Sequence, residues 1–261
     1  MKFALSLFAA VSFPVGLLAT SNTVTVNVTV PGAADVWLAG QPNATVLQGV
    51  FSLFDVAPAN SPVLGSTGMN LSGGGIVTFS ATGSTIYDPT LVPPNPCYGA
   101  PPDGTGCSAV SALSYFGIST YNGPLDSLIG VFIGAGTPGG TAPAGGNFTT
   151  GASQSQTTYS PLLNQVFFIG DGLTENGTGT VQQFVVPAGA TRLYLGSADG
   201  AGANYNNSGS FSVIVTGPAG TVTGPGGTPA APAASTFVLV LTALLLVGVS
   251  GYWLKSRVPT V

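Results

Sequence analysis

Hydrophobic and polar residues alternate along much of the chain, beginning close to its N-terminus. Valine occupies every second position from Val24 to Val30, with Thr or Asn between. This period of two is typical of a half-buried β-strand. Similar short strands are predicted at residues 76–81, 128–133, 165–169, 181–186, 192–197 and 210–216. Clusters of Gly, Pro, Asn and Asp separate these strands, and no amphipathic stretch of helical length interrupts the series.

This succession of strands predicts an all-β domain over residues 22–216. The expected architecture is an antiparallel β-sandwich of jelly-roll type. A β-solenoid would require a fixed repeat length, and the sequence has none. The domain is long enough to bury a substantial core.

An uninterrupted hydrophobic run lies at each end of the chain. Residues 1–21 combine Lys2, an apolar stretch and small residues at the end, which is the pattern of a secretory signal peptide. Residues 233–254 contain no charge. As a helix rising about 1.5 Å per residue they would cover roughly 33 Å, enough to cross a hydrocarbon core of about 30 Å. We therefore expect an exported protein with one C-terminal transmembrane helix.

The residues around the second run predict its orientation and its link to the domain. Lys255 and Arg257 follow it directly, so the positive-inside rule places the tail, residues 255–261, in the cytoplasm and the β-domain outside. Residues 217–232 are rich in Gly, Pro and Ala and predict a linker. The sequence P-A-A-P-A-A-S-T at 229–236, before an apolar helix and a short basic tail, is loosely similar to bacterial PEP-CTERM sorting segments. A permanent anchor and a tail processed after export both remain open.

The scarcity of charge excludes several classes of function. Charged residues make up 5% of the chain, and histidine is absent, which removes His-dependent catalysis and His-ligated metal centres. The formal net charge of −4 excludes nucleic acid as a partner, because phosphate binding requires a basic patch. No segment pairs two carboxylates in the way that glycoside hydrolysis uses them. We expect a binding protein and not an enzyme.

The two cysteines, Cys97 and Cys107, flank a loop rich in Pro and Gly. An even number of cysteines so close together in an exported protein predicts one local disulfide. A thiolate metal site would lack two further Cys or His ligands.

The strongest concentration of oxygen donors lies in residues 197–211, between two predicted strands. Asp199 is followed by the amides of Asn206 and Asn207, with glycines between them. Ca²⁺ takes six to eight oxygen ligands from carboxylates, amides and backbone carbonyls. Asn, Gly and Ser are also ordinary residues of a hairpin turn. On spacing alone, a calcium site and a plain turn are both compatible with this loop.

Two segments of the chain resemble one protein family. They are L-Y-L-G-S-A-D-G-A-G-A-N-Y-N-N-S-G-S-F-S-V at 193–213 and V-T-F-S-A-T-G-S-T-I-Y-D-P at 77–89. Both are similar, in the same order, to the small bacterial galactose-binding lectins of the PA-I type, which are calcium-dependent jelly-roll sandwiches. The resemblance covers about half of the β-domain and leaves most of residues 22–63 outside.

The resemblance implies a set of calcium ligands in this chain. Asp199 would supply its carboxylate, Asn206 and Asn207 their side-chain oxygens, and Tyr87 and Ala203 their backbone carbonyls. In the family, the ion also binds two sugar hydroxyls, and here Asp199 and Asn206 would form the remaining hydrogen bonds to the sugar. The implied function is calcium-dependent carbohydrate binding at the cell surface. The alternative is a structural surface or matrix protein in which the same loop only stabilises the fold.

One loop of the chain departs from the family. The family's sugar pocket is completed by a loop that contains histidine, whereas the corresponding residues 88–123 of this chain carry both cysteines and aromatic residues that include Tyr98, Tyr115 and Phe116. An aromatic ring can stack on a sugar or pack into the core. Both interpretations are left open by the sequence.

Overall fold

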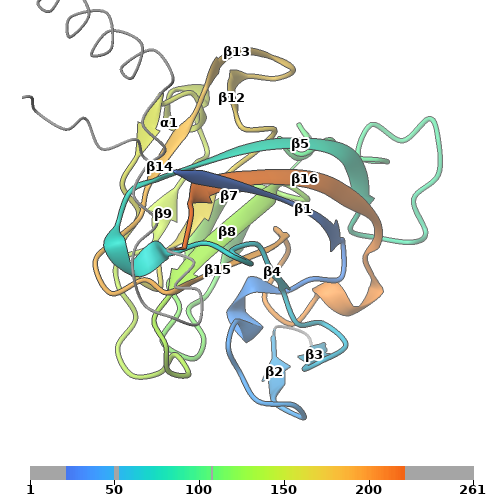
Figure 1. Ribbon diagram of the computed structural model, residues 1–261. Helices are drawn as coiled ribbons and strands as arrows, with labels where there is room; N and C mark the ends of the chain where they lie inside the picture. The colour runs from blue at the N-terminus through green and yellow to red at the C-terminus, as the bar shows by residue number, and fades with distance from the viewer. Residues whose placement is uncertain (1–21, 50–52, 107, 221–261) are drawn as a thin grey trace, which may run out of the picture. The chain divides into compact units, whose positions relative to one another are not determined.

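A computed structural model describes residues 22–49, 53–106 and 108–220 (Figure 1). The chain divides into two units, Met1–Gly220 and Thr221–Val261, and the described residues all belong to the first. The predicted signal peptide, the transmembrane helix and the cytoplasmic tail lie outside the described residues, as does most of the predicted linker. Among the described residues, no helix is long and apolar enough to cross a membrane.

The largest sheet has five strands and contains the longest strands of the fold. Its order is β1 (Thr23–Pro31), β16 (Ser208–Pro218), β5 (Ile76–Ile86), β14 (Gln183–Val185) and β10 (Thr158–Tyr159). All neighbours are antiparallel except β10 and β14. The strand β16 pairs with β1 from Thr23–Pro218 to Pro31–Ser210, and with β5 on its other side. Figure 1 shows β1, β16 and β5 running side by side as long ribbons.

A second sheet has four antiparallel strands. Its order is β11 (Val166–Phe168), β8 (Leu128–Ile133), β15 (Arg192–Ser197) and β4 (Val63–Leu64). Every residue of β8 is buried. The reason is that this sheet is covered on both faces, because the short 3-10 helix η1 (Val36–Leu38) also packs against β8 and β15.

Shorter elements complete the described domain. Small sheets are formed by β2 (Val46–Gln48) with β3 (Phe54–Val56), by β12 (Leu173–Glu175) with β13 (Thr178–Val181), and by β6 (Ala109–Ala112), β7 (Tyr121–Pro124) and β9 (Gly146–Asn147). The remaining helices are η3 (Leu71–Gly73), α1 (Gly151–Gln154) and η4 (Asn204–Asn206).

The core lies between the two large sheets. Phe184 of β14 and Phe167 of β11 meet there with ring centroids 5.4 Å apart, although they belong to different sheets. Phe184 also packs against Phe79 at 5.0 Å, and Phe167 against Phe132 at 5.2 Å. These contacts join the inner faces of both sheets into one hydrophobic cluster. The prediction of an all-β fold is confirmed, and the arrangement resembles a β-sandwich.

The N-terminal segment that the lectin resemblance left out is an integral part of this domain. It forms β1 at the edge of the large sheet and then η1 on the outer face of the smaller one. Trp37 of η1 is fully buried and donates from its indole Nε1 to the Ser119 carbonyl at 2.9 Å. Residues 22–63 therefore contribute both a strand and core side chains.

Candidate functional site

The predicted calcium loop connects β15 to β16, which pair with different sheets. It reverses direction through Gly202, whose positive φ of 83° favours glycine, and then through η4. The segment after β2 packs closely on it, since a Cβ at Gly49 would lie 1.8 Å from the Ala201 carbonyl oxygen. The loop is therefore held against the body of the domain.

Two carboxyl groups lie close together beside this loop. Asp126, in the connection from β7 to β8, accepts a hydrogen bond from the Tyr87 N–H at 3.0 Å through Oδ2. Its own N–H donates to the Ala198 carbonyl at 2.7 Å. Asp199 follows Ala198 and is near enough for its charge to raise the pKa of Asp126. The fold thus brings together the Tyr87 backbone, Asp126 and Asp199 from three separate segments.

Asn207 is the other buried member of this group. Only 8% of Asn207 is exposed, and its Oδ1 is buried without a hydrogen-bond partner among the described residues. Its side chain lies beside the Asp199 carboxylate and stabilises the charged form. The Oδ1 atom of Asp126 is likewise buried without a hydrogen-bond partner. A buried polar atom without a partner costs about 1–3 kcal/mol, so these oxygens are suited to receiving a ligand.

The surroundings raise the pKa of both carboxyl groups. Burial is the main cause for Asp199, whose pKa is about 6, and the Gly200 N–H, 2.6 Å from Oδ1, acts in the opposite direction. Burial raises the pKa of Asp126 to about 7, with a further contribution from repulsion by Asp199. Negative charge is thus unfavourable here unless a cation compensates it.

A second pair of carboxyl groups, those of Asp35 and Asp55 in the N-terminal segment, contacts the backbone of the loop. Asp55 Oδ2 accepts from the Asn204 N–H at 3.1 Å, and the Asp35 side chain contacts the Gly202 N–H and accepts from the Trp37 N–H at 2.8 Å. Both carboxyl groups are fully buried. Burial raises the pKa of each, and repulsion by Asp55 raises that of Asp35 further. The N-terminal segment thereby fixes the backbone on which the predicted ligands lie.

Within the described chain, no basic side chain compensates the four carboxyl groups near this loop. Arg192 is its one basic residue. The Arg192 guanidinium donates to the carbonyls of Gly134 and Gly136. Arg192 begins β15 and Asp199 lies beyond its end, so at about 3.3 Å per residue roughly 16 Å of strand separates them. A bound cation would compensate the charge that the protein leaves unpaired.

The remaining predicted ligands lie on the same loop. Ala203 caps the N-terminus of η4, and Asn206 is the last residue of this helix and is half-buried. Within residues 22–49, 53–106 and 108–220, no three Asp, Glu or Cys side chains form a cluster that could hold a metal ion. The predicted ligand set requires no such cluster, because its other oxygens come from amides and backbone carbonyls.

The neighbouring excursion at 88–123 is tied to the domain by aromatic residues, and it contains a disulfide-bonded cysteine. Tyr115 and Phe116 pack against the core, whereas 41% of Tyr98 is exposed. Cys97 is disulfide-bonded, and its predicted partner Cys107 lies outside the described residues. Of Tyr98, Tyr115 and Phe116, only Tyr98 has a largely exposed surface for a ligand.

Sequence reasoning did not identify Asp35, Asp55 or Asp126 as part of the site. Each is isolated in the sequence, far from Asp199. These carboxyl groups come close to Asp199 only because of the order of strands in the two sheets. The hydrophobic pattern of the sequence does not specify that order. The one available signal was compositional, because these three and Asp199 are half of the eight acidic residues in the chain.

The hydrogen bond from the Asn204 N–H to Asp55 predicts that Asp55 stabilises the folded domain. Asp55→Ala should lower the free energy of unfolding by about 1–3 kcal/mol, because the buried Asn204 N–H loses its acceptor. Asp55→Asn retains an acceptor and removes the repulsion of Asp35, so its effect should be smaller. Urea unfolding of both variants tests this, and equal destabilisation by Ala and Asn would contradict it.

Comparison of this chain with protein-family models and with curated proteins gives no match.

Proposed function

We propose that this chain is an exported, calcium-dependent carbohydrate-binding module with a jelly-roll-like sandwich, tethered or sorted through its C-terminal segment. The observation that carries the proposal is the Asn207 side-chain oxygen Oδ1, which is buried without a hydrogen-bond partner and belongs to an amide that interacts with the Asp199 carboxylate. The acidic surroundings, with the only described basic residue engaged elsewhere, support a cation at this point. The sequence resemblance to PA-I-type lectins points in the same direction.

The proposed ligand set matches the preferences of calcium. Asp199 supplies a carboxylate, Asn206 and Asn207 supply amide oxygens, and Tyr87 and Ala203 supply backbone carbonyls. Calcium accepts such mixed oxygen ligands at about 2.3–2.6 Å, and it fills the rest of its six to eight positions with water or ligand hydroxyls. Asn206, the more exposed of the two amides, is available to a sugar from solvent.

Asp126 has a supporting role in this proposal. Its hydrogen bond to the Tyr87 N–H holds that segment of backbone beside the loop. Its second oxygen is buried and free of hydrogen bonds. A calcium ion would therefore be flanked by a second negative charge, from a residue outside the ligand set that the lectin resemblance implies.

A structural protein is the second candidate function, and one observation favours it. Asp35 and Asp55 bind the backbone of the loop to the N-terminal segment. An ion bound to a loop so closely integrated with the fold would also stabilise the domain. In that case the protein would bind calcium, but the bound calcium would not bind a carbohydrate.

A glycan array probed with the full chain, in calcium and in a chelator, separates these two functions. The lectin proposal predicts binding of at least one carbohydrate in calcium and its loss in chelator. Calcium binding by calorimetry without any calcium-dependent glycan signal would favour the structural protein. Absence of calcium binding would contradict both the calcium-dependent lectin and the structural protein stabilised by calcium.

A further inference from the structure

The strand β1 is an outer strand of the largest sheet. One side of it pairs with β16, and within residues 22–49, 53–106 and 108–220 no strand pairs with its other side. Figure 1 shows β1 lying outermost, next to β16. It has nine residues, whereas the other outer strands of the two large sheets, β10, β11 and β4, have two or three. Of these four outer strands, only β1 offers an extended open edge.

The open edge of β1 lacks the features that usually prevent strands of two molecules from pairing. Proteins protect such edges with charged side chains, bulges, interior prolines or very short strands. The sequence of β1, T-V-T-V-N-V-T-V-P, has no charge, its proline is the last residue, and its register with β16 is unbroken. Val24, Val26 and Val28, on the face toward the core, are only half-buried. The edge therefore offers both backbone and apolar contacts to a partner.

The register with β16 shows which backbone groups of β1 face the open edge. The Gly32 N–H donates to the Gly209 carbonyl at 3.0 Å, and the Ala219 N–H donates to the Asn22 carbonyl at 2.9 Å, both in continuation of that register. Hydrogen-bonded pairs alternate with non-bonded pairs in an antiparallel ladder, so the even-numbered residues of β1 bond to β16. The N–H and carbonyl groups of the odd-numbered residues point to the open edge. Within the described chain, both groups lack a backbone partner in four residues, Thr23, Thr25, Asn27 and Thr29.

We propose that this edge pairs with the same edge of a second copy of the chain, antiparallel and centred on Val26. Thr23 then pairs with the partner's Thr29, and Thr25 with the partner's Asn27. Each bonded pair exchanges two hydrogen bonds, so this register satisfies all the open N–H and carbonyl groups of these residues in both copies. Val26 lies opposite the partner's Val26 in a non-bonded pair, where side chains are closest.

Charge and symmetry favour a second copy as the partner. The chain has a formal net charge of −4, which opposes association of two copies, but neither edge brings a charge to the contact. The open groups are self-complementary in the register centred on Val26. The pairing uses the open edge of both copies, so it closes at a dimer and does not continue into a fibre. The two five-stranded sheets become one continuous sheet.

The dimer carries two calcium loops at opposite ends of this shared sheet. The loop leads into β16 at Ser208, near the end of β1 at Pro31, and antiparallel pairing directs these ends away from each other. Two ligand sites on one particle increase the avidity for a surface that carries several ligands. The pairing itself needs no calcium and does not rest on the proposed function.

Cysteine cross-linking of the full chain in mild detergent tests the register. In Val26→Cys, the two Cα atoms are about 4.5 Å apart across the interface, within the range that a disulfide spans. Mild oxidation should convert this variant to a covalent dimer. Ile214→Cys is the matched control, because Ile214 is exposed on β16 opposite Asn27. Three strand spacings, roughly 14 Å, separate it from its copy, so it should form no covalent dimer.

Asn27→Pro tests the backbone pairing through the Kd of the dimer, measured by sedimentation equilibrium. It removes an N–H that points to the open edge and leaves the bonds of β1 to β16 in place. The Kd should rise at least about tenfold, since each copy loses one hydrogen bond across the interface. Asn27→Thr retains the N–H and should dimerise like the parent.

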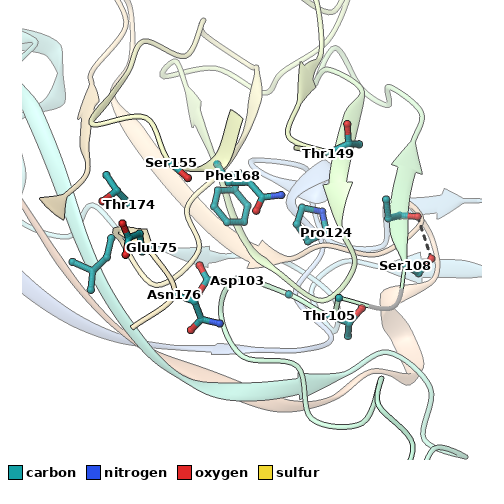
Figure 2. Close-up of a pocket in the computed structure, with 15 residues that line it drawn as sticks. Asp103, Thr105, Ser108, Pro124, Thr149, Ser155, Phe168, Thr174, Glu175 and Asn176 are labelled. Carbon is teal, nitrogen blue, oxygen red and sulfur yellow. Dashed lines mark hydrogen bonds between the residues drawn. The ribbon is translucent and has the colours of Figure 1, made fainter. Parts of the chain in front are cut away.

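A pocket elsewhere on the domain provides a second control. It has a volume of about 650 Å³, and Figure 2 shows Phe168, Glu175 and Asn176 in its lining, which includes no residue of β1. Glu175 is exposed, so Glu175→Ala changes the surface charge without altering the edge and should leave the Kd of the dimer unchanged.

Three results would overturn the proposed dimer, and none of them bears on calcium binding. One is a parent protein that stays monomeric. Another is cross-linking of Val26→Cys that does not exceed that of Ile214→Cys. The third is a dimer that Asn27→Pro leaves unchanged, because the two copies would then be joined through another surface.

Discussion

Asp199→Ala is expected to abolish the stabilisation of this protein by calcium. A ligand that binds only the folded state at 100 times its Kd stabilises it by about 2.7 kcal/mol. For a domain of this size, that corresponds to an increase in Tm of roughly 5–10 °C. Because Asp199 is the carboxylate of the proposed ligand set, the variant should show no increase. Thermal unfolding with and without calcium, together with calorimetric titration, measures the effect.

Glu175→Ala is the control for this experiment. It removes one negative charge from an exposed position on β12, outside the calcium loop, and should retain the full response to calcium. If Asp199→Ala kept that response as well, the ion would have to bind elsewhere, and the proposed ligand set would be wrong.

The calcium-free protein is expected to become more stable as the pH falls from about 7.5 to 5. Burial raises the pKa of Asp126 to about 7 and those of Asp103 and Asp199 to about 6, and the pKa values of Asp35 and Asp55 are raised as well. In this range the folded state therefore binds more protons than the unfolded state, whose carboxyls titrate near 4. Stability rises with falling pH wherever that is so. From the three groups with pKa values of about 6 to 7, the gain should be on the order of 5 kcal/mol.

Urea unfolding at pH 7.5 and pH 5 measures this gain, and calcium provides its control. A bound ion favours the ionised carboxylates, so saturating calcium should reduce the difference between the two pH values. Asp88 has a lowered pKa and acts in the opposite direction, but it lies at the surface. Histidine cannot contribute, because the chain has none. Stability that fell between pH 7.5 and 5 would show that these carboxyls are already ionised without calcium.

Strands with clear alternation or a continuous apolar run were predictable from the sequence. The strands β8 and β15 have the predicted bounds, and β1, β5 and β16 extend the predicted segments by one or more residues. Eight strands were not predicted: β2, β3, β4, β6, β7, β9, β10 and β12. They have two to four residues each, which is too short for a periodic pattern to distinguish from a loop. Their positions follow from tertiary packing.

The candidate site was predictable only where it is local in sequence. Asp199, Asn206 and Asn207 lie on one connection, so their proximity is visible in the sequence. Asp126, between β7 and β8, itself has a positive φ of 62°, a backbone conformation that is rare outside glycine and that the sequence does not reveal. Asp35 and Asp55 depend on how the N-terminal segment folds back over η4. Long-range topology, not residue type, determines these positions.

The strand β16 separates the candidate calcium site from the point where the described chain leaves the sheet. Asn207 immediately precedes its first residue, Ser208, and Pro218 is its last. At about 3.4 Å per residue, the strand holds these ends roughly 34 Å apart. If a surface ligand pulled on the loop while the C-terminal segment was anchored, the force would act along β16. The hydrogen bonds of β16 to β1 and β5 would then be loaded together in shear and not opened one at a time.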